Sequence, residues 1–137
     1  MTAYAKPLPT VDESNAPHWQ GAKARELRVQ KCSDCGRLRY PPARHCAMCL
    51  SEKFAWVALS GKGEVWSHCA FHRAYFKGFE HELPYTVVLV KLDEGPLLYS
   101  NLEGVPREAV RVGMRVRAVF EDVTGEVTLI KFRPQPE

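Results

Sequence analysis

Hydrophobic and polar residues alternate with a period of two through most of the chain after residue 63, which is typical of strands with one buried face. We predict five such strands, with one helical turn at Pro106–Val110 after the third. They are Glu64–His72, Leu83–Leu92, Leu97–Leu102, Met114–Phe120 and Glu126–Phe132. Five antiparallel strands hide their edges best by closing, so we predict a five-stranded OB-fold barrel, with a small open sandwich as the alternative.

The chain before the barrel has shorter patterns. Residues 1–13 hold few apolar positions and are typical of a flexible arm. Asn15-Ala16-Pro17 supplies a capping residue and a first-turn proline, so we predict a short helix that ends between Lys23 and Glu26. Trp19 on this helix is either an anchor for another protein or a cover for the rest of the chain.

Four cysteines form two Cys-x-x-Cys pairs: Cys32 with Cys35, and Cys46 with Cys49. Two such pairs supply four thiolates, the tetrahedral set that Zn²⁺ prefers, and leave no open coordination position. We therefore predict a structural zinc ribbon. The predicted mainly-β chain divides into an arm and helix (1–26), a ribbon (27–53) and a barrel (54–137).

Other interpretations of these cysteines agree less well with the sequence. A redox Cys-x-x-Cys would occur once, in a strand–helix context. Disulfides would need an exported protein, and the N-terminal sequence has no signal-peptide pattern, so we expect a cytoplasmic location. His45 lies beside Cys46 and could replace one sulfur, although four cysteines already complete the set.

Composition narrows the possible partners. The chain has 137 residues, of which 45% are hydrophobic and 26% charged, and no apolar run approaches the roughly 20 residues of a membrane span. Four thiolates and one Zn²⁺ together add a charge of −2, which brings the formal net charge from +3 to +1. A polyanion-binding protein usually has a larger basic excess, so nucleic acid is an unlikely partner.

The loop Arg73–Glu82 joins the first two predicted barrel strands and combines aromatic with basic residues. OB-folds often bind ligands with this loop, and aromatic faces with nearby cations suit a nucleotide. The alternative is a lid whose aromatic side chains plug the barrel mouth.

No catalytic set is evident elsewhere. His68 and His72 lie four apart on a strand, roughly 13 Å from one another, so they cannot share a metal ion. We expect Cys69 to lie in the barrel core, because free cysteines are commonly buried.

Several motifs follow one another in order across both parts of the chain: Trp19-Gln-Gly21, Leu27-x-Val29-Gln30-x-Cys32, Cys35-Gly36, Tyr40-Pro41-Pro42, Cys46-x-x-Cys49, Trp56-Val57, Ser60-Gly61-x-Gly63, Pro84-Tyr85 and Gly113-Met114-x-Val116. Together they resemble a known family, formerly a domain of unknown function, with a rubredoxin-like zinc ribbon and an acyl-CoA-associated OB-fold. The resemblance extends from about Asn15 to Pro134. Leu50 departs from it, because many relatives have glycine there.

This resemblance implies an accessory subunit of a hetero-oligomeric complex, in which a thiolase-like enzyme, or alternatively a hotdog-type hydratase, performs the chemistry near bound acyl-CoA. Together with the composition of the loop and the place of Trp19 on a short helix, this resemblance leads us to expect that the residues facing CoA are Arg73, Tyr75, Phe76, Lys77 and Phe79, and that those docking the partner are Trp19, Arg37 and Arg39. The competing functions are a module that binds single-stranded nucleic acid and, less favoured, a small self-sufficient enzyme.

Overall fold

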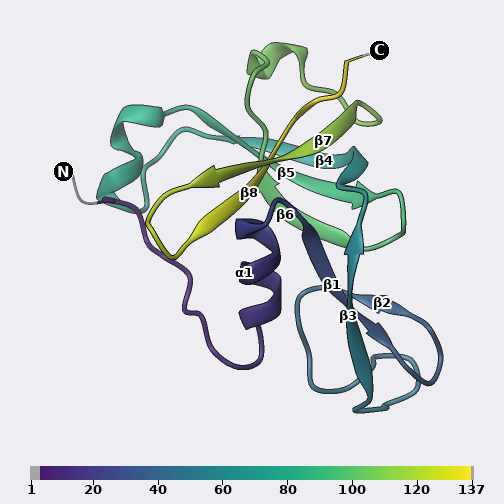
Figure 1. The fold of residues 1–137 in the computed structure, drawn as a ribbon. Coiled ribbons are helices and arrows are strands. Elements are labelled where there is room, and N and C mark those ends of the chain that lie inside the picture. Colours follow the sequence, from purple (N-terminus) through teal and green to yellow (C-terminus); the bar gives the residue numbers. More distant parts are fainter. Residues whose placement is uncertain (1–3, 137) are drawn as a thin grey trace.

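The computed structural model describes residues 4–136, which form two sheets, one short α-helix and two 3-10 helices (Figure 1). Helix α1 spans Ala16–Lys23, and the first sheet has the order β2-β1-β3. Its strands are β1 (Leu27–Cys32), β2 (Leu38–Arg39) and β3 (Phe54–Leu59). Strand β3 pairs with β1 along its whole length, from Leu27 opposite Leu59 to Cys32 opposite Phe54. The first sheet therefore includes a strand that follows the second cysteine pair in the sequence.

The second sheet has the strand order β6-β5-β4-β7-β8, and every neighbouring pair is antiparallel. Its strands are β4 (Lys62–Phe71), β5 (Tyr85–Leu92), β6 (Leu97–Asn101), β7 (Arg115–Asp122) and β8 (Thr128–Pro134). Two short 3-10 helices, η1 (Lys77–Glu82) and η2 (Arg107–Ala109), lie in the connections. The sheet nearly closes between β6 and β8, where Leu102 forms a bridge with Phe132. The predicted mainly-β fold with an OB-like barrel is confirmed.

One hydrophobic core joins the two sheets. Val88 and Val90 of β5 and Phe132 of β8 are fully buried in the barrel. Leu27 and Val29 of β1 belong to the same cluster, so the first sheet packs its inner face against the barrel. Because both sheets bury apolar surface in this core, their stabilities are linked.

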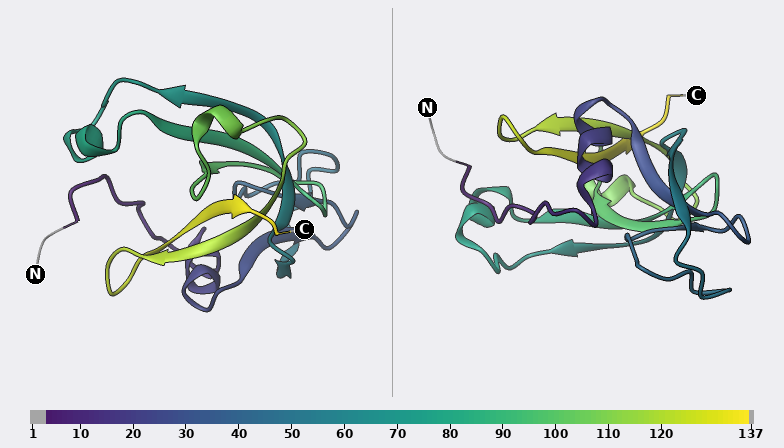
Figure 2. Two further views of the ribbon diagram at one scale, coloured as in Figure 1. Left: turned by 90° about the horizontal axis from the view of Figure 1, so that it is seen from above. Right: turned by 60° about the horizontal axis from the view of Figure 1, so that its bottom comes forward.

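Helix α1 packs against β1 of the first sheet and against β7 and β8 of the barrel. Figure 2 shows it on the side of β7 and β8. Arg25, just after the helix, donates two hydrogen bonds of 2.9 and 2.7 Å to the carboxylate of Asp122 in β7. These bonds, first among the causes, lower the pKa of Asp122 from its usual value. Buried His18 lies 2.9 Å through Nδ1 from the carbonyl oxygen of Arg28.

Two sequence-based predictions were wrong. Asn15 precedes α1 without capping it, since its side chain accepts from the Asp12 amide and donates to the Thr10 carbonyl. Cys69 is exposed rather than buried in the core. A β-bulge at Trp66 shifts the register of β4, and a one-residue shift moves every later side chain to the other face.

None of the helices described for residues 4–136 is long and apolar enough to cross a bilayer.

Candidate functional site

The four cysteines of the two Cys-x-x-Cys pairs converge on one point. Their sulfur atoms all lie within 4.8 Å of one another, and the Cys32–Cys49 and Cys35–Cys46 separations are 3.5 Å. Tetrahedral Zn²⁺ with bonds of about 2.3 Å requires sulfurs about 3.8 Å apart, so the cluster fits that ion. His45 instead lies 3.5 Å through Nε2 from Glu52, outside the four-sulfur cluster.

The thiols of this cluster differ in how readily they ionise. Backbone amides, that of Cys35 first, lower the pKa of Cys32 to about 6. The amide of Ser51 acts in the same direction on Cys49, but the surrounding thiols, that of Cys32 first among them, outweigh it and raise the pKa of Cys49 to about 12. A divalent cation would remove this conflict, because bound metal stabilises every thiolate.

The two cysteine pairs turn in the same way. The amide of Gly36 donates to the carbonyl of Cys32 at 3.0 Å, and the amide of Leu50 donates to that of Cys46 at 2.9 Å. Both residues lie in the left-handed region, with φ of +79° and +64°. Glycine adopts this conformation freely, whereas a leucine there is strained by roughly 1–2 kcal/mol.

We predict that Leu50→Gly stabilises the zinc-loaded protein by up to about 1 kcal/mol, because relief of the strain outweighs the greater freedom of glycine in the unfolded chain. Leu50 is 73% exposed, so little packing is lost. Gly36→Leu is the matched control and should destabilise the protein, since no atom would meet its Cβ and only backbone strain changes. Denaturant midpoints measure both, and a lower midpoint for Leu50→Gly would contradict the prediction.

The loop expected to face CoA lies partly against the barrel and partly in solvent. Tyr75 and Phe76 are 65% and 56% exposed, and the Arg73 guanidinium lies 5.4 Å above the ring of Tyr75. Lys77 is exposed at the start of η1. Phe79 packs at 5.0 Å from Tyr85, so it is the least available of the five residues.

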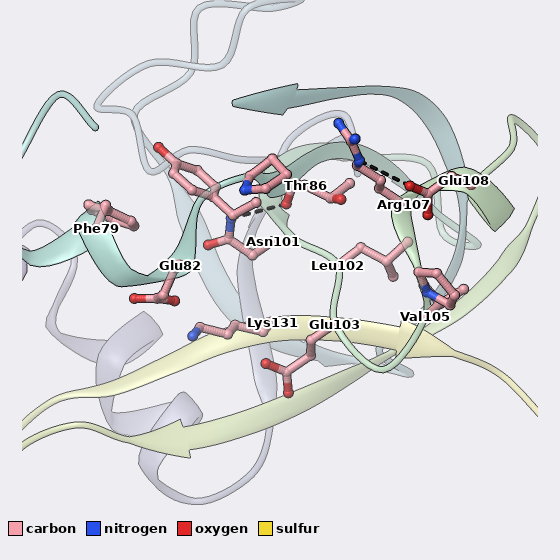
Figure 3. Close-up of a pocket in the computed structure, with 13 residues that line it drawn as sticks. Phe79, Glu82, Thr86, Asn101, Leu102, Glu103, Val105, Arg107, Glu108 and Lys131 are labelled. Atoms are coloured by element: carbon pink, nitrogen blue, oxygen red, sulfur yellow. Dashed lines mark hydrogen bonds and ion pairs between the residues drawn. The ribbon is translucent and has the colours of Figure 1, made fainter. Parts of the chain in front are cut away.

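A pocket of about 490 Å³ opens between η1, the segment after β6, and β8 (Figure 3). Phe79 is the only predicted CoA-facing residue that lines it. Its charged residues are Glu82, Glu103, Arg107, Glu108 and Lys131. In the view of Figure 3, Arg107 and Glu108 lie at the end opposite Glu82 and Lys131. Carboxylates outnumber cations here, so the pocket is poorly suited to the phosphates of CoA.

The three residues expected to dock a partner are in different environments. Trp19 is half-buried and lines a hollow of about 220 Å³ together with Tyr99 of β6. Arg37 is exposed in a groove that includes Leu97. Arg39 is buried, and its Nε donates a hydrogen bond to the side-chain oxygen of Gln30 at 2.7 Å. Its guanidinium therefore holds the ribbon together, and we leave it out of the docking surface.

Family models match both parts of the chain. The model described as the rubredoxin-like zinc ribbon domain of ChsH2 matches residues 19–55, and the model of the C-terminal OB-fold domain of ChsH2 matches residues 56–121. A scaffold protein with a DUF35 domain from Methanocaldococcus jannaschii is 32% identical over 85% of this chain and 87% of its own length. This chain belongs to the DUF35 family.

Other relatives of this chain are named as subunits of acyl-CoA enzymes. A probable enoyl-CoA hydratase alpha subunit from Thermomonospora curvata is 36% identical over 94% of this chain and 40% of its own length. A benzoylsuccinyl-CoA thiolase subunit from Thauera aromatica is 30% identical over 61% of this chain and 56% of its own. The chain thus spans about two fifths of the hydratase subunit.

A solved structure has the same DUF35 architecture. One chain of an aldolase described as Ltp2-ChsH2(DUF35) superposes with a TM-score of 0.83 at 36% identity. The superposition covers 93% of this chain and 98% of that one.

Proposed function

We propose that this chain is a non-catalytic accessory subunit of an acyl-CoA-processing complex, with a thiolase-like enzyme as its partner and a hotdog-type hydratase as the alternative. The observation that carries the proposal is a DUF35 ribbon and barrel in which no serine, threonine or cysteine side chain is hydrogen-bonded to a histidine among residues 4–136. His72, for example, lies against the Arg107 guanidinium at 3.1 Å, beside a cation and not beside a nucleophile. Relatives named as hydratase and thiolase subunits support it.

We further propose that the four cysteines bind one structural Zn²⁺. Cys32, Cys35, Cys46 and Cys49 would hold the ion, and a closed set of four thiolates leaves it no open position for substrate. The metal would fix the two turns that carry these cysteines, and with them the position of Arg37 beside the barrel.

The proposal is tested by co-expression with the thiolase-like and hydratase-like enzymes encoded in the same genome. The expected result is a stable complex with one of them, and acyl-CoA turnover by the complex but not by the isolated chain. Turnover by the pure chain that is lost on a point substitution would overturn the accessory role. Co-purification with single-stranded nucleic acid instead of an enzyme would favour the competing binding module.

Within such a complex, Trp19→Ala is expected to weaken association by about 2 kcal/mol, or roughly 30-fold, because it removes an aromatic anchor from the hollow beside Tyr99. Titration of the partner enzyme measures the change. Met48→Ala, at a position 67% exposed on the second cysteine turn, is the control for losing an exposed apolar side chain elsewhere. Equal affinities of the Trp19→Ala and Met48→Ala variants for the partner enzyme would show that Trp19 is not part of the docking surface.

Lys77→Ala is expected to leave assembly unchanged and to raise the KM of the complex for acyl-CoA. The exposed ammonium would attract the phosphates of CoA, so the difference from the unmodified complex should shrink as salt increases. Steady-state kinetics at two ionic strengths measure it. A KM that does not change at low salt would contradict the assignment of this loop to CoA.

A further inference from the structure

Strand β5 has the composition of a strand that is covered on both faces. Thr86, Val88 and Val90 point into the barrel and are buried. Val87 and Leu89 alternate with them and point outward, yet they are equally apolar and remain partly exposed. A strand with one solvated face normally alternates apolar with polar residues. The outward residues of β5 therefore have the apolar composition that is typical of a contact surface.

The neighbouring strands extend this apolar surface. By register, Leu89 lies between Ser67 of β4 and Tyr99 of β6, and Lys91 lies opposite Leu97. The β-bulge leaves Trp66 47% exposed, and Tyr99 and Leu97 are 75% and 40% exposed. We call these residues the outer face of the barrel: Trp66, Cys69, Val87, Leu89, Leu97 and Tyr99.

Nothing among residues 4–136 covers the outer face. In both views of Figure 2, α1 lies on the side of β7 and β8, away from the outer side of β4 and β5. The face is continuous with the residues proposed to dock a partner, because Tyr99 shares a hollow with Trp19 and Leu97 shares a groove with Arg37.

The aromatic side chains of the outer face and the adjoining loop offer more than half of the area that a stable heteromeric contact buries on one partner. Taking about 200 Å² for each aromatic side chain, the exposed fractions of Trp66, Tyr99, Tyr75 and Phe76 amount to about 500 Å² of aromatic surface. A standard interface buries roughly 800 Å² on each partner, and aromatic residues are enriched in such interfaces. Four exposed aromatic side chains would supply more than half of that area.

The charges at the border indicate the chemistry of the occupant. Lys91 lies with its Nζ 4.6 Å over the ring of Trp66, and Arg73 lines the hollow that adjoins Cys69. Two carboxylates lie beside the face: Glu64 is opposite Lys91, and Glu94 lines the groove that also contains Leu97 and the cation Arg37. The cations Lys91, Arg73 and Arg37 still outnumber them. An occupant with an apolar centre and carboxylates at its border would complement this surface.

We propose that the outer face of the barrel is the main contact for the acyl-CoA enzyme subunit, which would present an apolar surface bordered by carboxylates. This inference rests on the proposed function and adds to it which surface of the chain the enzyme subunit covers. It also explains the position of the loop, because an enzyme seated on the outer face has Arg73 and Tyr75 at the edge of the contact.

Cys69 is a direct probe of this contact, because it is exposed on the outer face and lies outside the four-cysteine cluster. Maleimide labelling of the zinc-loaded chain is compared free and in the complex, with Cys69→Ser to identify its signal. We expect the complex to slow labelling of Cys69 at least tenfold. Tyr99→Ala should weaken assembly at least about tenfold, whereas Val112→Ala, 64% exposed but outside the outer face, should not.

The possible outcomes separate this inference from the proposed function. A complex that forms while Cys69 is labelled at the free rate, with Tyr99→Ala assembling normally, overturns the inference and leaves the accessory role intact. Failure to assemble with any acyl-CoA enzyme overturns both. Protection of Cys69 in the isolated chain that increases with protein concentration would assign the face to a second copy, and protection by a single-stranded oligonucleotide would assign it to nucleic acid. Either result overturns the inference.

Discussion

Cys35→Ser is expected to abolish tight zinc binding and to disorder the chain between β1 and β3. Structural zinc in small ribbons contributes about 10–16 kcal/mol of apparent binding free energy, which is coupled to folding. Because Leu27 and Val29 of β1 also pack in the barrel core, the barrel should remain folded but melt at a lower temperature. Elemental analysis and amide NMR signals of residues 27–53 measure the two effects.

Cys69→Ser is the matched control, since it replaces a cysteine outside the cluster and should keep one zinc per chain. The prediction is contradicted if Cys35→Ser retains one zinc and an ordered ribbon. If the unmodified protein, purified without chelator, held far less than one zinc per chain, the proposal of a structural metal would be contradicted.

Phe132→Ala is expected to destabilise the barrel by about 3–5 kcal/mol, because it leaves a cavity at a fully buried position of β8. The residue also bridges to Leu102 across the seam between β6 and β8, so its loss should weaken the closure of the barrel. The shift in denaturant midpoint at constant slope measures the change.

Phe76→Ala provides the comparison, since it removes the same ring from a position 56% exposed and should change stability by no more than about 0.5 kcal/mol. Similar losses for the two variants would show that Phe132 is not the centre of the core.

Local patterns in the sequence determined the elements and the candidate metal centre. The alternation along β5 and β8 predicted strands because a strand's side chains point to opposite faces in turn, and that signal lies within a few residues. The two Cys-x-x-Cys pairs predicted one four-sulfur cluster because each pair makes its own turn, and the structure brings their sulfurs together. The resemblance to a family with an accessory role also came from motifs along the chain.

Only the tertiary structure decided which surfaces remain available. Arg39 looked like a docking residue, but its partner Gln30 and the ring of Phe54 come from other strands. Cys69 looked like a core residue until the bulge at Trp66 reversed its side of the sheet. Local patterns cannot contain such effects, because burial depends on segments that are distant in sequence and meet only in the folded chain.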